Sequence, residues 1–146
     1  MLEVYTEIII NSSSETIWHH LTNFSQYTQW NPFLINAKGE IKVSSKIQIT
    51  AQSSGFKSMT FNPTIVKVEN RQELRWKGRS LIPGIFDGEH IFKLEELASN
   101  QTKFIQQEFY SGLLVLLLAK KLKTTSRKGF ESMNKSLKDI SESKIK

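Results

Sequence analysis

One histidine of this sequence lies where it could take part in chemistry. His90 stands in the alternating segment HIFKL, and in an extended chain it shares a face with Phe92 and Leu94. The next segment also alternates, and the residues that share its inward face are Phe104, Gln106, Glu108 and Tyr110. A buried imidazole beside a buried carboxylate can move a proton, so His90 and Glu108 are the catalytic candidates. The alternative, which we favour, is a hydrogen-bonded pair that orients the polar end of a ligand or tightens the sheet.

Other catalytic and metal-binding signatures are missing from the sequence. The chain has no cysteine, no pair of histidines at helical spacing and no Asp-rich calcium loop, so we expect no metal. It also has no glycine-rich phosphate loop and no nucleophile elbow, and we expect no cofactor. We favour a binding protein over an enzyme, because positioned polar groups in apolar pockets more often orient a ligand than catalyse a reaction.

The net charge of +6 is concentrated at the C-terminal end of the chain. Residues 1–118 carry eleven basic and eleven acidic side chains, whereas residues 119–146 carry nine basic and three acidic ones. Because the main body is electrically balanced, we expect no nucleic-acid partner. Two hypotheses remain for the basic segment: contact with an anionic membrane surface through Lys120, Lys123 and Arg127, or a solvated outer face, which we favour.

Length and composition indicate a single domain over residues 1–146, because no Pro/Gly/Ser-rich stretch divides the 146-residue chain. The absence of cysteine fits a reducing compartment, and the N-terminus does not resemble a signal peptide. The longest apolar run, Leu113 to Ala119, is far shorter than the roughly 20 residues that span a bilayer. We therefore expect a soluble, cytoplasmic protein.

The order of predicted elements is a strand, two short helices, a series of strands and a long helix. The first strand covers about 3–10, and the serines that follow it are N-cap candidates for a helix over 14–21, with a second turn at 24–29. Six β-like segments then cover about 34–42, 46–53, 56–69, 72–79, 84–97 and 101–112. Short turns between them predict an antiparallel meander, and Pro63 predicts a bulge or bend.

The last segment, about 113–143, is predicted to be one long amphipathic helix. Its inner face carries Leu122, Ser126, Gly129, Phe130, Met133, Leu137 and Ile140. A glycine inside a helix costs about 1 kcal/mol relative to alanine, so Gly129 asks for a steric reason. Either the sheet packs directly against Gly129, or the helix stands off and leaves room for a ligand. We expect the second, so that a leucine at this position would enter free space.

Several segments, taken in order, resemble a known family. They are Trp18 in its helix, WNPF at 30–33, ELRWKG at 73–78, FDGEHIFKLEE at 86–96, TKFIQQEFYSG at 102–112 and GFESMNKSLK at 129–138. Together they span nearly the whole chain and resemble the START-like (SRPBCC) superfamily of helix-grip proteins. The similarity is greatest to the members described as polyketide cyclase/dehydratase and lipid-transport proteins.

The resemblance implies an α+β helix-grip fold. In this fold a curved antiparallel sheet of about six to seven strands wraps around the long C-terminal helix, and two short helices follow the first strand. The resemblance also implies a cavity between sheet and helix that receives an apolar ligand. We expect this cavity to be lined by Trp30, Phe33, Phe61, Trp76, Phe86, His90, Phe92, Phe104, Gln106, Glu108, Leu122, Ser126, Gly129, Phe130 and Met133.

Three functions follow from this expectation. The first is binding or transport of a small hydrophobic ligand such as a lipid, an isoprenoid or a polyketide-like compound. The second is a cyclase/dehydratase in which His90 and Glu108 move protons. The third is a membrane-surface or protein-interaction module that uses the basic helix. The expected partners are a small apolar ligand and, transiently, an anionic membrane surface, with the protein itself a monomer or a homodimer.

Overall fold

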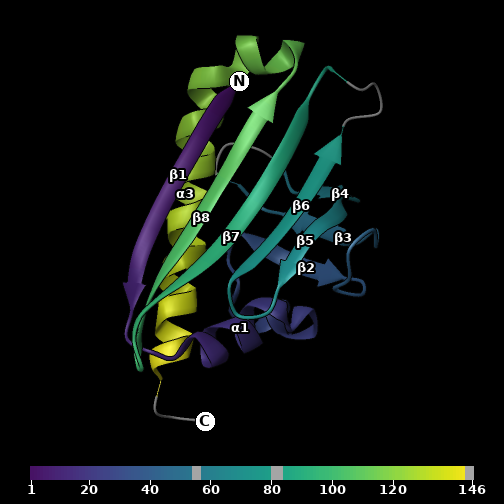
Figure 1. Cartoon of the computed structure of the whole chain (residues 1–146). Helices are drawn as coiled ribbons and strands as arrows, with labels where there is room; N and C mark the ends of the chain where they lie inside the picture. The colour runs from purple at the N-terminus through teal and green to yellow at the C-terminus, as the bar shows by residue number, and fades with distance from the viewer. Residues whose placement is uncertain (54–56, 80–83, 144–146) are drawn as a thin grey trace.

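A long C-terminal helix lies along one face of a twisted antiparallel sheet (Figure 1). The computed structural model describes residues 1–53, 57–79 and 84–143. In these ranges the larger sheet has the strand order β1-β8-β7-β6-β5. Its strands are β1 (Leu2–Ile10), β5 (Thr64–Glu69), β6 (Glu73–Arg79), β7 (Asp87–Ala98) and β8 (Gln101–Ser111). The smaller sheet consists of β2 (Leu34–Lys38), β3 (Gln48–Ala51) and β4 (Met59–Phe61). The helix is α3 (Leu113–Glu142).

Two short helices and a turn follow β1, and the first of them begins where the sequence supplies an N-cap. They are α1 (Ser14–Thr22), the 3₁₀ turn η1 (Phe24–Gln26) and α2 (Tyr27–Trp30). The Ser13 hydroxyl accepts a hydrogen bond of 3.2 Å from the Thr16 N–H, which caps the start of α1. Ile17 and Leu21 on its inner face are fully buried. Asn31 Oδ1 then accepts from the N–H groups that follow it and ends the helical segment before Pro32.

The predicted meander is divided into two sheets, and the break lies at Pro63. The predicted strand 56–69 becomes β4 and β5, because proline has no N–H to donate to a sheet ladder and bends the chain there; Phe56 lies outside the described residues. The two sheets still meet, since the Ile47 N–H donates to Pro63 O at 3.0 Å and the Ile65 N–H to Ser45 O at 2.9 Å. The predicted helix-grip architecture is confirmed, with more strands than the six to seven expected.

The edge strand β1 is covered by polar side chains of α3. Arg127 Nη1 donates to Tyr5 O at 3.0 Å, and Lys138 Nζ donates to Ile9 O at 3.0 Å. At the end of the helix, Glu142 Oε2 accepts from the Asn11 N–H at 2.7 Å and from Lys138 Nζ. Unpaired groups of an edge strand otherwise invite pairing with another chain. Part of the positive charge of the helix therefore satisfies the backbone of β1.

The small residues of the inner helix face each have a packing partner. A Cβ on Gly129 would lie only 2.5 Å from Cδ1 of Phe33, whose ring stands edge-on to Phe130 with 5.6 Å between the ring centroids. The Ser126 hydroxyl lies 2.7 Å from that of Tyr110, within hydrogen-bond distance. The prediction of free space at Gly129 is therefore wrong. An aromatic ring from the segment after α2 occupies the place that the sequence suggested for a ligand.

We expect Gly129→Leu to lower the free energy of unfolding by about 1 to 3 kcal/mol, because the new side chain must displace the packed Phe33 ring. Urea unfolding followed by circular dichroism measures this. The matched control is Ser132→Leu, at an exposed position of the same helix, which should change stability by less than about 0.5 kcal/mol. Equal stability of the Gly129→Leu variant and the unaltered protein would contradict the packing at this position.

Candidate functional site

The register of the large sheet arranges its inward side chains in cross-strand rows, three of which form the site. The middle row contains Val4, Glu108, His90 and Trp76. On one side lies a row of Thr6, Gln106, Phe92 and Leu74, and on the other a row of Leu2, Tyr110, Gly88 and Gly78. The two catalytic candidates are thus direct cross-strand neighbours, as their alternation predicted. Hydrogen bonds tie this middle row to the Gln106 row.

A buried chain of polar side chains connects the sheet to the helix. His90 Nδ1 lies 2.7 Å from Glu108 Oε1, and His90 Nε2 lies 2.9 Å from Gln106 Oε1. Gln106 Nε2 donates to Asn134 Oδ1 at 2.7 Å, and Asn134 Nδ2 donates to Thr6 Oγ1 at 2.9 Å. The Thr6 hydroxyl closes the chain by donating to Gln106 O at 2.8 Å. Four elements, β7, β8, α3 and β1, therefore share one network.

The direction of each hydrogen bond in this network follows from the backbone carbonyl of Gln106, at which the network ends. A carbonyl only accepts, so the Thr6 hydroxyl gives its proton to Gln106 O and accepts from Asn134. Asn134 Oδ1 accepts from the Gln106 amide group, which turns Gln106 Oε1 towards His90. His90 Nε2 must therefore carry a hydrogen. One further proton lies between His90 Nδ1 and Glu108, which form an imidazolium with a carboxylate or an imidazole with a carboxylic acid.

The imidazole of His90 is held too tightly to reach a bound molecule. The residue is 4% exposed, and its ring has Trp76, Phe92 and Phe130 around it, with centroid distances of 5.5, 4.5 and 5.1 Å. Both of its nitrogens are already hydrogen-bonded. Of the two catalytic candidates, Glu108 is the one that can contact a ligand, because its side chain is 16% exposed.

The other carboxylate oxygen of Glu108 faces a part of the sheet that has no side chains. A Cβ on Gly88 would lie 2.4 Å from Glu108 Oε2, so only glycine leaves room for this carboxylate. Gly78 lies opposite Gly88 on β6, and its nearest side chains are Pro63 and Phe61, at 3.7 and 3.8 Å from a Cβ placed there. Two glycines on adjacent strands thus remove side-chain volume from the sheet beside Glu108.

Tyr110 follows Glu108 on β8 and lies opposite Gly88, at the same end of the site. Burial, with a contribution from the charge of Glu108, raises the pKa of Tyr110 well above its ordinary value. Its hydroxyl therefore stays protonated, and Ser126 on α3 lies within hydrogen-bond distance of it. The glycine end, defined as Gly78, Gly88, Glu108, Tyr110 and Ser126, combines a carboxyl group and two hydroxyls with a bare stretch of sheet. Such a mixture suits a ligand that is mostly apolar with one polar end.

The predicted lining residues fall into two groups. Buried in the interior are Phe33, Trp76, His90, Phe92, Phe104, Gln106, Ser126, Phe130 and Met133. Half-buried at its border are Trp30, Phe61, Phe86, Glu108, Leu122 and Gly129. Their role in ligand binding stays a prediction. Sequence reasoning missed Thr6, Gly88 and Asn134, although Thr6 alternates with buried Val4 and Asn134 is a polar residue beside Met133 on the inner face.

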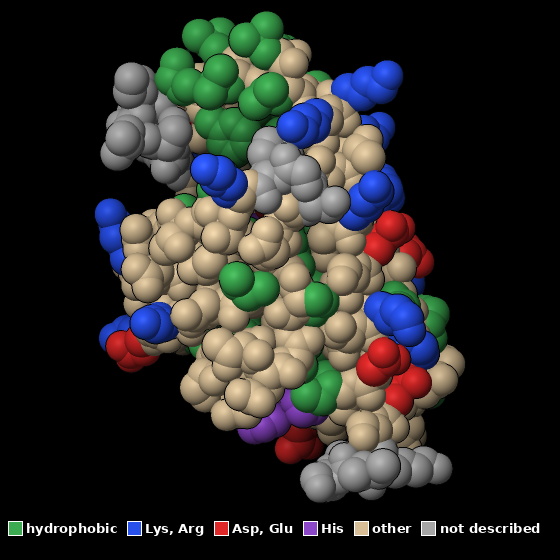
Figure 2. Space-filling view, turned by 180° about the vertical axis from the view of Figure 1, so that it is seen from behind, with side chains coloured by type: hydrophobic (Ala, Val, Ile, Leu, Met, Phe, Trp, Pro, Cys, Tyr) green, Lys and Arg blue, Asp and Glu red, His purple; other side chains and the backbone are tan. Residues whose placement is uncertain are grey.

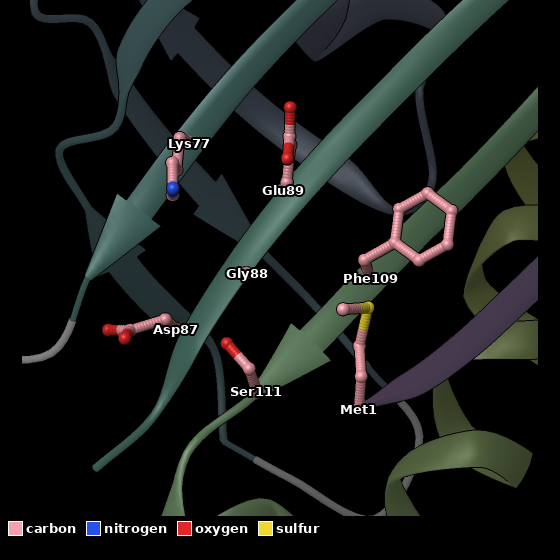
Figure 3. Close-up of a pocket in the computed structure, with 7 residues that line it drawn as sticks. All are labelled: Met1, Lys77, Asp87, Gly88, Glu89, Phe109 and Ser111. Atoms are coloured by element: carbon pink, nitrogen blue, oxygen red, sulfur yellow. The ribbon is translucent and has the colours of Figure 1, made fainter. Parts of the chain in front are cut away.

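A hollow of about 390 Å³ lies on the opposite face of the sheet (Figure 3). Its lining includes Lys77, Glu89 and Phe109, which point away from α3 because they alternate with the inward residues. Gly88 belongs to this lining as well. Within the described ranges, no group of three or more His, Asp or Glu side chains lies close enough together to hold a metal ion.

Fold and site together define a helix-grip protein whose interior holds a hydrogen-bonded histidine–carboxylate pair. Comparison with protein families agrees over residues 1–138, and the chain belongs to the family described as polyketide cyclase / dehydrase and lipid transport. The resemblance of the six sequence segments is thereby confirmed. A search among curated proteins found no match.

Solved structures share this fold at low sequence identity. A hypothetical protein from Helicobacter pylori is 18% identical, with a TM-score of 0.79 over 95% of this chain and 87% of that one. The Zhui aromatase/cyclase from a Streptomyces species is 8% identical, with a TM-score of 0.79 over 99% and 95% of the two chains. A START superfamily protein from Mycobacterium smegmatis is 19% identical, with a TM-score of 0.75 over 96% and 97%. At these identities the likeness shows a common fold.

We expect the His90 ring to carry a hydrogen on Nε2, because Gln106 Oε1 only accepts. Nitrogen–proton correlation spectra of the histidine rings measure this, with the exposed His19 as an internal reference. In Glu108→Gln the new amide should donate to Nδ1 and leave a neutral ring with its hydrogen on Nε2. A folded protein with a bare Nε2 would contradict the hydrogen-bond directions.

Proposed function

We propose that this protein binds a small hydrophobic molecule at the glycine end, between the sheet and α3, with the polar end of the ligand at Glu108 and Tyr110. The observation that carries the proposal is the position of Glu108. Its carboxyl group is held by His90 on one side and faces the bare sheet at Gly88 on the other. Charged groups are rarely placed among aromatic side chains without a polar partner.

The surroundings of the glycine end support an apolar ligand. Phe86 lies near Tyr110, with 5.9 Å between the ring centroids, and Phe61 lies near Gly78. Binding pockets for small molecules are mostly apolar, with a few polar groups that fix orientation. Membership of a family described as polyketide cyclase / dehydrase and lipid transport points to the same ligand class. A lipid, an isoprenoid and a polyketide-like compound all fit this description.

A second candidate function is proton transfer on a polyketide-like substrate, favoured by the proton held between His90 and Glu108. Because both His90 nitrogens are hydrogen-bonded, Glu108 would exchange the proton with the substrate. His90 would position the Glu108 carboxyl group and return a proton to it. The structural neighbours named as aromatase/cyclase proteins are consistent with this chemistry. We favour binding or transport, because the histidine is enclosed by hydrogen bonds and rings.

The identity of the ligand is the first thing to measure. Native mass spectrometry of the protein purified from cells, followed by extraction and identification of the bound molecule, tests the proposal directly. We expect a co-purified apolar molecule with one polar end. Recovery of only ligand-free protein, together with no binding of the neutral dye Nile red, would contradict a hydrophobic ligand site.

The glycine end can be filled without disturbing the core. We expect Gly78→Leu to weaken Nile red binding at least about tenfold, equivalent to about 1.4 kcal/mol, while stability changes by about 1 kcal/mol or less. A Cβ at Gly78 would meet Pro63 and Phe61 at ordinary contact distances. Fluorescence titration measures the affinity, and Ala98→Leu at an exposed position of β7 is the control. Unchanged dye affinity in the stable Gly78→Leu variant would place the ligand elsewhere.

Glu108→Gln separates a binding role from a catalytic one. For a binder, the variant should reduce affinity for the extracted ligand only modestly, because an amide still offers hydrogen bonds. For an enzyme, turnover should fall by about a hundredfold or more with little change in binding. Incubation of the ligand with fresh protein, followed by mass analysis, gives the readout. A ligand returned unchanged by the unaltered protein excludes the catalytic role for that molecule.

A further inference from the structure

The first turns of α3 expose an unusual amount of apolar surface. The exposed residues are Leu113 (65%), Leu114 (41%), Leu116 (74%), Leu117 (81%) and Leu118 (38%), which we call the leucine tip. Val115, in their midst, is 3% exposed and fixes the turn to the core. Figure 2 shows the cluster as a continuous green patch at one end of the molecule. Exposed apolar patches of this kind mark interaction sites.

The leucine tip is held in place by backbone contacts. The Leu113 N–H donates to Gly84 O at 3.1 Å, and the Leu114 N–H donates to Ile85 O at 2.9 Å. The preceding Gly112 has φ of +116°, and a Cβ there would lie 2.4 Å from Ile85 O. Only glycine allows this turn, which directs the helix start away from the end of β8. In Figure 1 these turns lie beyond the upper ends of β1 and β8.

Positive charge lies directly behind the leucine tip. Leu116 and Lys120 are one turn apart, which is about 6 Å along a helix. Residues 112–130 include Lys120, Lys121, Lys123, Arg127 and Lys128 and no acidic residue. Figure 2 shows blue side chains bordering the green patch. Because Arg127 is bonded to the backbone of β1, the cations considered for an external partner are Lys120 and Lys123.

We propose that the leucine tip docks on an anionic lipid surface, with its leucines at the boundary of the acyl chains and Lys120 and Lys123 at the lipid phosphates. Interfacial segments bury their apolar side chains about 5 to 10 Å deep in the membrane. This depth matches the length of the one helical turn that separates Leu116 from Lys120. Among the described residues no helix is long and apolar enough to cross a membrane, so the contact is with the surface.

The charges favour a lipid surface over a second copy of the chain. Two copies packed tip to tip would bring their lysines close together, and exposed charges repel over about 10 Å at 0.1 M salt. Anionic headgroups attract the same lysines, each contributing about fivefold to binding. The leucine tip shares no residue with the glycine end, so docking and ligand binding can succeed or fail independently.

Flotation of the full chain with vesicles tests the proposal. The vesicles are phosphatidylcholine alone, or phosphatidylcholine with an equal amount of phosphatidylglycerol. We expect the protein to float with the anionic vesicles and to be released as salt rises. The paired substitution Leu116→Ser and Leu117→Ser should reduce binding at least about tenfold at any salt concentration.

Matched variants separate the two parts of the surface. Lys120→Gln with Lys123→Gln should reduce binding to anionic vesicles by about twenty-fivefold, from about fivefold for each lysine. Lys38→Gln with Lys42→Gln makes the same change in net charge on exposed residues at the end of β2 and beyond it, and should have little effect. Leu97→Ser removes an exposed leucine (51%) near the β7–β8 turn and is the control for the apolar change.

Three results would overturn the proposal. The first is failure of the folded protein to float with anionic vesicles. The second is an equal loss of binding in the control variants. The third is a stable dimer in sedimentation equilibrium, dissociated by the paired Leu116→Ser and Leu117→Ser substitution, in a protein that does not bind vesicles. That result would assign the leucine tip to contact with a second copy of the chain. Circular dichroism melting confirms that each variant is folded.

Discussion

Polar groups that lose their water when a helix closes on a sheet must find partners within the protein. Here this requirement is met by one chain of hydrogen bonds from Glu108 through His90, Gln106 and Asn134 to Thr6. An unpaired buried group costs about 1 to 3 kcal/mol, whereas a typical bond contributes only about 1. The network therefore does more to fix the position of α3 on the sheet than to raise the free energy of unfolding. It fixes α3 against β1 and β8 at one register, because Asn134 must reach both Thr6 and Gln106.

The same constraint fixes the aromatic part of the interior, whereas the proposed ligand site lies at the glycine end. Aromatic rings fill the space around the network, and Phe33 packs against Gly129, which lies between Ser126 and Asn134 on α3. At the glycine end, Gly78 and Gly88 place no side chain beside Glu108. Under the proposed function, the Glu108 carboxyl group, held by His90 through one oxygen and lying over Gly88 through the other, would orient the ligand without moving. Binding would then need little reorganisation of the site.

The basic helix serves more than one purpose, and the structure separates its charges by what they contact. Arg127 and Lys138 donate to carbonyl groups of β1 and protect the edge of the sheet. Lys120 and Lys123 stand behind the leucine tip, at the opposite end of the helix from its contact with Asn11. A single amphipathic helix thus closes the core with one face, covers a strand edge with another and presents an apolar end to the outside.

Local periodicity was enough to predict the order of the elements and the facing positions of His90 and Glu108, because strands alternate every two residues and neighbouring strands of a hairpin share that alternation. The helix-grip class itself came from the resemblance of six segments to a known family. The pattern also identified the inner face of α3. It did not identify which distant side chain meets that face: whether Gly129 borders a ligand or a ring depended on Phe33, which arrives from a segment far away in the sequence. For the same reason Thr6 and Asn134 joined the polar network unforeseen, and only the structure revealed that the apolar run at the start of α3 is exposed. Sequence determines which residues prefer to leave water, whereas only the packed chain decides which of them find a partner.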